Sequence, residues 1–219
     1  MRQARPGLLT LILLAWIGLG QALGLDFDRL RDNLTIRFGQ DQLPLFNEWR
    51  QLMLSARNTS EQEKIRLIND FFNQRIGFDD DHFVWNQRDY WATPIETMGQ
   101  RAGDCEDFSI AKYFSLLELG IPTNKLRLVY VRASLPMIGG GTAQQAHMVL
   151  AYYPRPNADP LVLDNLNKQI LPASQRYDLS PVFSFNSAGL WQGTGNQSSG
   201  SSLSRWQDLL VRARAEGFQ

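Results

Sequence analysis

Cysteine is almost missing from this chain of 219 residues, in which Cys105 is the single example. One thiol cannot form a disulfide within the chain, although exported proteins usually use their cysteines in pairs. A lone thiol is either a buried, inert side chain or a group with a chemical task. The residues around Cys105 therefore have to distinguish between these two interpretations.

Net charge and a membrane-length apolar run are missing too. The 22 basic and 22 acidic residues cancel, so nothing indicates a nucleic acid or a membrane surface as partner. Arg2 and Arg5 precede an uncharged apolar run over residues 8–19, which is short for a membrane span, and small residues follow it at 22–24. This pattern predicts a signal peptide over residues 1–24 and one exported domain over residues 25–219; a retained N-terminal anchor is the alternative.

Helical and strand-like patterns occupy different parts of the sequence. Apolar residues recur at helical spacing before Gly120, and a capping box at Ser60 and Glu63 opens one of these segments. The predicted helices cover residues 41–56, 60–77, 103–119 and 203–215, and the predicted strands cover residues 126–133, 147–153 and 161–164. This order predicts an α+β fold in which the helix that begins near Cys105 packs on an antiparallel sheet.

Cys105 lies in the predicted first turn of that helix. The start of a helix presents free N–H groups and a partial positive charge. Both favour the thiolate, which is the nucleophilic form of cysteine, and the same N–H groups can hold the oxyanion of a tetrahedral intermediate. We therefore expect Cys105 to be a nucleophile with a lowered thiol pKa.

The general base for Cys105 has to be one of two histidines, His82 or His147, if it is a histidine at all. His147 is the better candidate because it begins a predicted strand, which gives it a fixed position. Asp164 ends the next predicted strand, seventeen residues later. A hairpin between the two strands places Asp164 beside His147, where it can accept a hydrogen bond and fix the imidazole tautomer.

Several segments together resemble a known family. They are the motif Gly-Asp-Cys-Glu-Asp-Phe at 103–108, then Lys112, His147, the Leu-Asp-Asn segment at 163–165 and the Tyr-Trp-Ala-Thr-Pro segment at 90–94. This set is similar to the bacterial transglutaminase-like cysteine proteinases, and in particular to their LapG type. The similarity extends over most of residues 25–219.

The resemblance implies a papain/transglutaminase-like fold and a periplasmic endopeptidase with the triad Cys105, His147 and Asp164. Members of this type release a large biofilm adhesin from the outer membrane by cutting it near its N-terminus, at a di-alanine site. They are inhibited by the periplasmic domain of an inner-membrane receptor that senses cyclic di-GMP in the cytoplasm. For this chain, the resemblance therefore implies an adhesin as substrate and such a receptor as inhibitor.

Three acids, Asp104, Glu106 and Asp107, flank the nucleophile. The resemblance implies that they bind Ca²⁺, which members of the family need. Unbalanced, their charges raise the thiol pKa of Cys105, and a bound hard cation removes this problem. The alternative is that they only cap the first helical turn. The acids at 79–81 lack the spacing of an EF-hand loop, and we expect them to form a solvated turn.

Two other functions stay compatible with these residues. A transglutaminase or a peptidoglycan amidase on the same fold could use the same triad, because acyl transfer to an amine needs the same groups as hydrolysis. A binding module that has kept the fold and lost the chemistry is the other alternative. The joint presence of Cys105, His147 and Asp164 argues against that module.

Overall fold

Helices form the N-terminal part of the fold. The computed structural model describes residues 25–195, 197–200 and 202–218, so the predicted signal peptide at 1–24 lies outside the described residues. The helical elements that precede the large sheet are α1 (Phe27–Phe38), η1 (Gln40–Gln42), α2 (Leu43–Ala56), α3 (Glu61–Arg75), α4 (Asp81–Trp85), α5 (Pro94–Gln100), α6 (Cys105–Glu118) and η2 (Thr123–Lys125). Two short strands, β1 (Gly77–Phe78) and β2 (Ala102–Gly103), pair in parallel among them.

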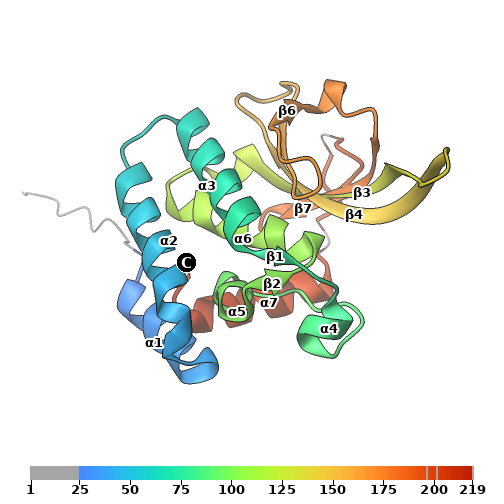
Figure 1. Cartoon of the computed structure of the whole chain (residues 1–219). Coiled ribbons are helices and arrows are strands. Elements are labelled where there is room, and N and C mark those ends of the chain that lie inside the picture. Colours follow the sequence, from blue (N-terminus) through green and yellow to red (C-terminus); the bar gives the residue numbers. More distant parts are fainter. Residues whose placement is uncertain (1–24, 196, 201, 219) are drawn as a thin grey trace, which may run out of the picture.

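A six-stranded antiparallel sheet follows, in the order β6-β5-β4-β3-β7-β8. Its strands are β3 (Leu126–Pro136), β4 (Thr142–Tyr152), β5 (Leu161–Leu163), β6 (Leu171–Pro172), β7 (Leu179–Asn186) and β8 (Gly189–Gln192), with η3 (Ala173–Gln175) after β6. Helix α7 (Ser204–Glu216) closes the described chain and lies against the helical part. Figure 1 shows the helices and the sheet as neighbouring layers, with α6 between them.

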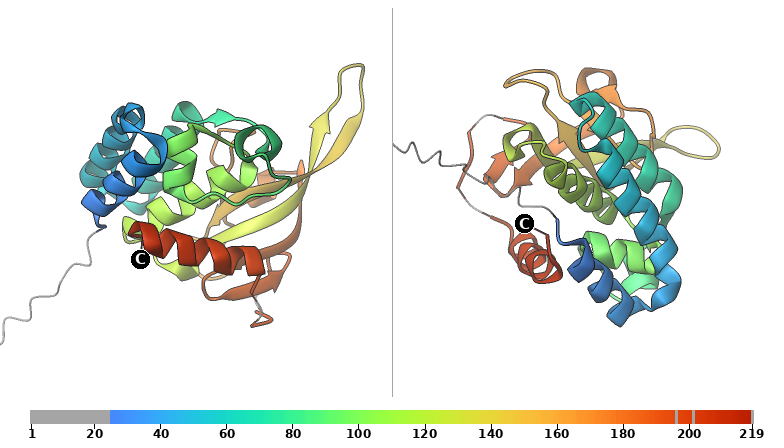
Figure 2. Two further views of the ribbon diagram at one scale, coloured as in Figure 1. Left: turned by 90° about the horizontal axis from the view of Figure 1, so that it is seen from below. Right: turned by 90° about the vertical axis from the view of Figure 1, so that its left-hand side faces the viewer.

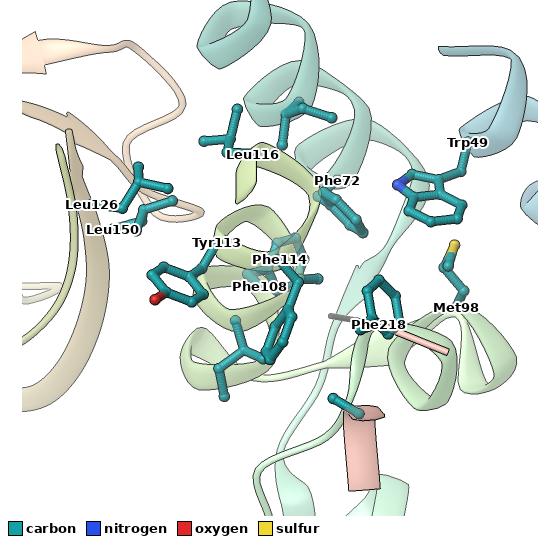
Figure 3. Packing of buried hydrophobic residues seen from close by; sticks show 14 of the residues in the cluster. Trp49, Phe72, Met98, Phe108, Tyr113, Phe114, Leu116, Leu126, Leu150 and Phe218 are labelled. Atoms are coloured by element: carbon teal, nitrogen blue, oxygen red, sulfur yellow. The ribbon is translucent and has the colours of Figure 1, made fainter. Parts of the chain in front are cut away.

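The main core lies between α6 and its neighbours on both sides. Aromatic residues of α6 sit between apolar residues of the sheet and those of the other helices, as Figure 3 shows for Phe108, Tyr113 and Phe114. Trp49 of α2 is fully buried, and its indole N–H donates to Ser115 Oγ of α6 at 3.0 Å. Burial of these rings stabilises the packing of α6 between the sheet and the other helices.

The predicted α+β fold, with a helix that begins at Cys105 and packs on an antiparallel sheet, is confirmed. Two details of the helices were wrong. Ser60 caps α3 by accepting from the Glu63 N–H, but the Glu63 side chain binds Arg66 instead of closing a capping box. The same helix ends at Arg75, and Gly77 already belongs to β1.

Residues 78–93 contain helix α4, which was not predicted. The expectation of a solvated turn at 79–81 was also wrong, because Asp81 is buried at 3% exposure while Asp79 and Asp80 are exposed. Helices α1 and α5 and strands β1, β2, β6, β7 and β8 were not predicted either. Within the described ranges, no helix has both the length and the apolarity that a membrane span requires.

Candidate active site

The start of α6 is shaped by Gly103 and Asp104. Asp104 is the N-cap, and its carboxylate accepts from the N–H groups of Glu106 at 3.1 Å and Asp107 at 3.5 Å. Gly103 has no room for a side chain, because an added Cβ would lie 2.6 Å from an Asp107 carboxylate oxygen and 2.7 Å from the Asp107 Cβ. The Gly-Asp-Cys order thus lets Asp107 fold back over the chain while Cys105 takes the first helical position.

The Cys105 sulfur is half-buried and lies close to carboxylates. Its Sγ is 2.7 Å from Glu106 Oε2. Burial raises the pKa of the Cys105 thiol far above its usual range, and the negative charges of Glu106 and Asp104 raise it further, while the N–H of Met148 acts in the opposite direction. In the chain without a cation, these effects outweigh the helix-start effect that predicted a lowered pKa.

His147 and Asp164 lie together on adjacent strands. Asp164 directly follows β5, which pairs with β4, and its Oδ1 is 2.8 Å from His147 Nε2. Both side chains are buried, at 3% and 1% exposure. Because Nε2 binds the carboxylate, Nδ1 is the imidazole nitrogen left for another partner. The hydrogen bond expected between these two residues is therefore present.

A buried arginine that the sequence did not suggest holds the other side of the carboxylate. Arg176 Nη2 donates to Asp164 Oδ2 and to Asp178 Oδ2, each at 2.7 Å, and the Leu166 N–H donates to Asp164 Oδ1 at 3.0 Å. Burial by itself raises the pKa of Asp164, but His147, Arg176 and the Leu166 N–H outweigh it and lower that pKa well below its usual range. Asp164 is therefore an ionised carboxylate in a fixed orientation.

Lys112 of α6 binds the main chain of Asp164. Its Nζ donates to Asn69 Oδ1 at 2.9 Å, to Asn73 Oδ1 at 2.8 Å and to the main-chain oxygen of Asp164 at 3.2 Å. Asn73 Nδ2 donates to the same main-chain oxygen at 2.8 Å. Burial lowers the pKa of Lys112 to about 7. This network ties the turn after β5 to α3 and to the helix that carries the sulfur.

The first turns of α6 lie against β4 next to His147. Ser109 Oγ donates to the main-chain oxygen of Met148 at 3.1 Å, and the Met148 N–H is close enough to the sulfur to lower the thiol pKa of Cys105. Among the described residues, the sulfur hydrogen-bonds to Glu106, and no hydrogen bond joins it to His147. The structure thus brings Cys105 beside the strand that carries His147, and their catalytic roles stay predictions. His82, the other histidine, is exposed on α4.

Carboxylates gather beside the sulfur in two overlapping groups. Carboxylate oxygens of Asp81, Asp104 and Asp107 lie within 4.8 Å of one another, and Asp104, Cys105 and Glu106 form a second such set. Burial raises the pKa of Asp104 to about 10 and that of Asp81 to about 6, and repulsion among the acids adds to both shifts. Burial also raises the pKa of Asp107 well above its usual range. Bound protons or a cation must therefore neutralise the negative charge of this cluster.

The donor set fits a hard cation. Asp81 Oδ1 is buried and has no hydrogen-bond partner, which is costly for a carboxylate oxygen unless a cation binds it. Asp107 is held by the Ala92 N–H at 2.8 Å and by the Trp85 indole N–H at 3.4 Å, so it is fixed in place. Asp81 was missed as a candidate ligand, because the run of acids at 79–81 indicated only a solvated turn.

A cleft lies beside Glu106, at the start of α6. It has a volume of about 470 Å³ and is lined by Asp89, Trp91, Glu106, Tyr130, Phe183, Leu203, Ser204 and Arg205. Its apolar wall is firm, because the rings of Tyr130 and Phe183 stack at 5.1 Å and those of Trp91 and Phe185 at 5.4 Å. The cleft therefore combines a rigid aromatic wall with charged and polar groups, among them Glu106.

Comparison with known proteins decides the family. The family model described as bacterial transglutaminase-like cysteine proteinase matches residues 47–198, which include the predicted triad. The chain belongs to this family. It is a transglutaminase-like cysteine protease, and the α+β fold described above is the transglutaminase-like fold.

Solved structures of one relative agree with this assignment. Calcium-bound LapG from Legionella pneumophila is 36% identical, with a TM-score of 0.72, over 85% of this chain and 98% of that chain. EGTA-treated LapG from the same organism is 35% identical, with a TM-score of 0.72, over 87% of this chain and 98% of that chain. No curated protein sequence matches the chain. The predicted likeness to the LapG type is thereby confirmed.

Proposed function

We propose that this chain is a periplasmic, calcium-dependent cysteine endopeptidase that cuts the N-terminal region of a large cell-surface biofilm adhesin and so releases it. The observation that carries the proposal is the placement of the half-buried Cys105, at the start of α6, beside the strand whose His147 is bound to a buried, ionised Asp164. This arrangement has the parts that thiol-based peptide cleavage needs. Membership of a proteinase family favours hydrolysis over crosslinking or mere binding.

In the proposed mechanism, His147 Nδ1 accepts the Cys105 proton, and the thiolate attacks the peptide carbonyl. The imidazolium then protonates the leaving amine, and water hydrolyses the acyl-enzyme. Asp164 keeps the proton of the neutral imidazole on Nε2, so that Nδ1 is free to act as the base. Asp104 already binds the N–H groups of Glu106 and Asp107, which leaves the Cys105 N–H as the helix-start donor for the oxyanion.

Calcium is part of the proposal because the acidic cluster fits it. Asp104, Glu106 and Asp107 would hold the ion, as the resemblance implies, and the structure adds Asp81 to the candidate ligands. When bound, Ca²⁺ supplies positive charge that offsets the carboxylates next to the sulfur. The calcium-bound and EGTA-treated forms of the related LapG support a calcium site in this family.

The remaining elements of the proposal concern location and partners. Residues 1–24 would direct export, and the mature chain would act in the periplasm. The inhibitor would be the periplasmic domain of an inner-membrane receptor for cyclic di-GMP. Support for these elements comes from the likeness to LapG and from the N-terminal sequence pattern.

The test is cleavage of the N-terminal region of a large adhesin from the same cell by the purified chain. Two fragments should form with calcium, and none should form in excess chelator or with Cys105→Ala. An amine acceptor in a parallel reaction separates protease from transglutaminase, because crosslinked or amine-labelled product in place of fragments would contradict the proposal. Cleavage by Cys105→Ala would show that the nucleophile is a different residue.

A further inference from the structure

Strand β4 has a free edge beside the sulfur. Its neighbour β5 pairs with it only at residues 150–152. Over residues 142–149, none of the described strands pairs with β4 on that side. Residues 142–146 are all exposed, and Figure 2 shows the β3–β4 hairpin projecting from the body of the molecule. Part of this strand can therefore accept another strand.

The register shows which main-chain groups point to that edge. In an antiparallel pair, every second residue directs its N–H and C=O away from the partner strand. The Ser134 N–H donates outward to the main-chain oxygen of Asp178 at 2.8 Å, so Ser134 and its partner Gln144 form a non-hydrogen-bonded pair. The N–H and C=O groups of Gln144, and two residues on those of Ala146, therefore point to the free edge.

The same alternation continues to the sulfur. Met148 is the next residue in this series, and its outward main-chain groups lie against α6, where the oxygen accepts from Ser109 Oγ at 3.1 Å. Residues two apart on a strand are separated by about 7 Å. The outward groups of Ala146 therefore lie about one peptide repeat from the groups that meet the nucleophile's helix.

The edge also lacks the features that normally prevent strand addition. Native sheets protect exposed edges with charged side chains, prolines or bulges. Residues 142–146 read Thr-Ala-Gln-Gln-Ala, with no charge and no proline, and they pair with β3 without a break in register. An exposed, unprotected strand edge that leads to the helix of the nucleophile is therefore suited to bind an extended peptide.

We propose that the free edge of β4 at Gln144 and Ala146 binds the substrate main chain as an added strand, which delivers the scissile bond to Cys105. The inference rests on the proposed endopeptidase activity and specifies its substrate class: a segment with free main-chain groups that can become extended. Strand addition uses main-chain hydrogen bonds for affinity and leaves sequence selection to the neighbouring pockets. A site inside a stable helix or sheet should therefore resist cleavage until it unfolds.

Amide hydrogen exchange tests the contact directly. The probe is a ten-residue peptide with a central Ala-Ala, added in saturating amount to calcium-loaded Cys105→Ala. Exchange at the outward amides of Gln144 and Ala146 should slow at least about fivefold, the effect of one net hydrogen bond. The amides of Gln145 and His147 already bond to β3 and serve as the internal control, because their exchange should stay unchanged.

A matched pair of variants tests the contact by kinetics. Gln144→Pro removes the outward N–H, and proline is tolerated on an edge strand where that group faces solvent. Gln144→Ala removes the same side chain and keeps the N–H. We expect kcat/KM for the decapeptide to fall about fivefold in Gln144→Pro relative to Gln144→Ala. Alkylation of Cys105 by iodoacetamide should proceed at the same rate in both, which shows that the nucleophile is intact.

The outcomes separate the two proposals. Cleavage by the wild type, with unchanged exchange at Gln144 and Ala146 in the saturated Cys105→Ala complex, would overturn strand addition and leave the endopeptidase standing. Equal kcat/KM in the proline and alanine variants would count against strand addition in the same way. If the calcium-loaded wild type cleaves neither the decapeptide nor the adhesin region, the proposed function fails and this inference fails with it.

Discussion

Replacing Asp164 by asparagine exchanges one carboxylate oxygen for an NH₂ group in a site where each oxygen already accepts hydrogen bonds. Oδ1 accepts from His147 Nε2 and from the Leu166 N–H, and Oδ2 accepts from Arg176. An asparagine can offer its oxygen to only one side. Since Arg176 is charged and cannot accept, the amide oxygen should turn toward it and the NH₂ group toward His147.

That orientation predicts a specific defect. His147 Nε2 must then accept a hydrogen bond, so the imidazole proton moves to Nδ1, the atom that has to take the proton of Cys105. Loss of a hydrogen bond to a charged group alone corresponds to about 1.5–3 kcal/mol, or roughly 10- to 150-fold in rate. A wrong tautomer in a comparable triad lowers kcat by about 10⁴-fold. We therefore expect kcat of Asp164→Asn to fall between these limits.

The assay is kcat for a fluorogenic peptide with calcium, together with the Tm of each variant. Asp178→Asn is the matched control, because Asp178 binds the same arginine, is half-exposed and does not touch His147. Its kcat should stay within a few-fold of wild type. Wild-type kcat in Asp164→Asn, or an equal loss in both variants, would refute the argument that Asp164 acts by fixing the imidazole of His147.

The lowered pKa of Asp164 also predicts how stability depends on pH. The unfolded aspartate titrates near 3.9, and the folded protein holds the ionised form more strongly. The resulting stabilisation is therefore complete above about pH 5 and is lost as the pH falls toward the folded pKa. The free energy of unfolding should drop more steeply between about pH 4 and 2 in the wild type than in Asp164→Asn, as urea titrations at several pH values can show.

Further expectations concern the cation and the buried lysine. Excess EGTA should abolish cleavage and added calcium should restore it. Full activity in the chelator would show that the acids around Cys105 only cap the helix. Calorimetry should find weaker calcium binding in Asp81→Asn than in Asp79→Asn, and equal affinities would remove Asp81 from the ligands. Iodoacetamide should alkylate Cys105 faster with calcium than with EGTA, because the cation offsets the carboxylates that raise its pKa; equal rates would contradict this. Lys112→Met should lower the free energy of unfolding by about 1–3 kcal/mol, because the asparagine partners of Lys112 lose their hydrogen-bond donor. The control Lys64→Met, at a part-exposed site, should lower it less, and equal losses in urea titrations would contradict the prediction.

The sequence was sufficient to predict the elements that carry the predicted triad. A helix start at Cys105, the hairpin of β4 and β5, and the contact of His147 with Asp164 all follow from local patterns with clear signals. Strand β7 had no such signal, because Pro181 interrupts its alternation. Pro181 lies opposite Val131 of β3, and β8 pairs only with residues 183–186 of β7. Among the described strands, none therefore pairs with β7 on its other side at Pro181, where a proline is tolerated.

The residues that surround the predicted site were harder to predict, because they come from distant segments. Asp81 belongs to an acidic run that looks solvated, and only the folding of α4 against the start of α6 buries it beside Asp104 and Asp107. Arg176 follows η3 in a stretch with no motif, and it reaches Asp164 only through tertiary folding. Composition and spacing carry no information about such contacts.

Three buried polar side chains of helix α6 each have a hydrogen-bond partner on another element of the core. Ser109, Lys112 and Ser115 follow one another at intervals of three residues, and they bind β4, the turn after β5 and Trp49 of α2. Were the helix to rotate or slide by one position, several polar groups would lose their partners together, at about 1–3 kcal/mol each. These hydrogen bonds therefore fix both the rotation of α6 about its axis and its position along that axis. They hold the sulfur at the N-terminus of the helix in place without any covalent crosslink.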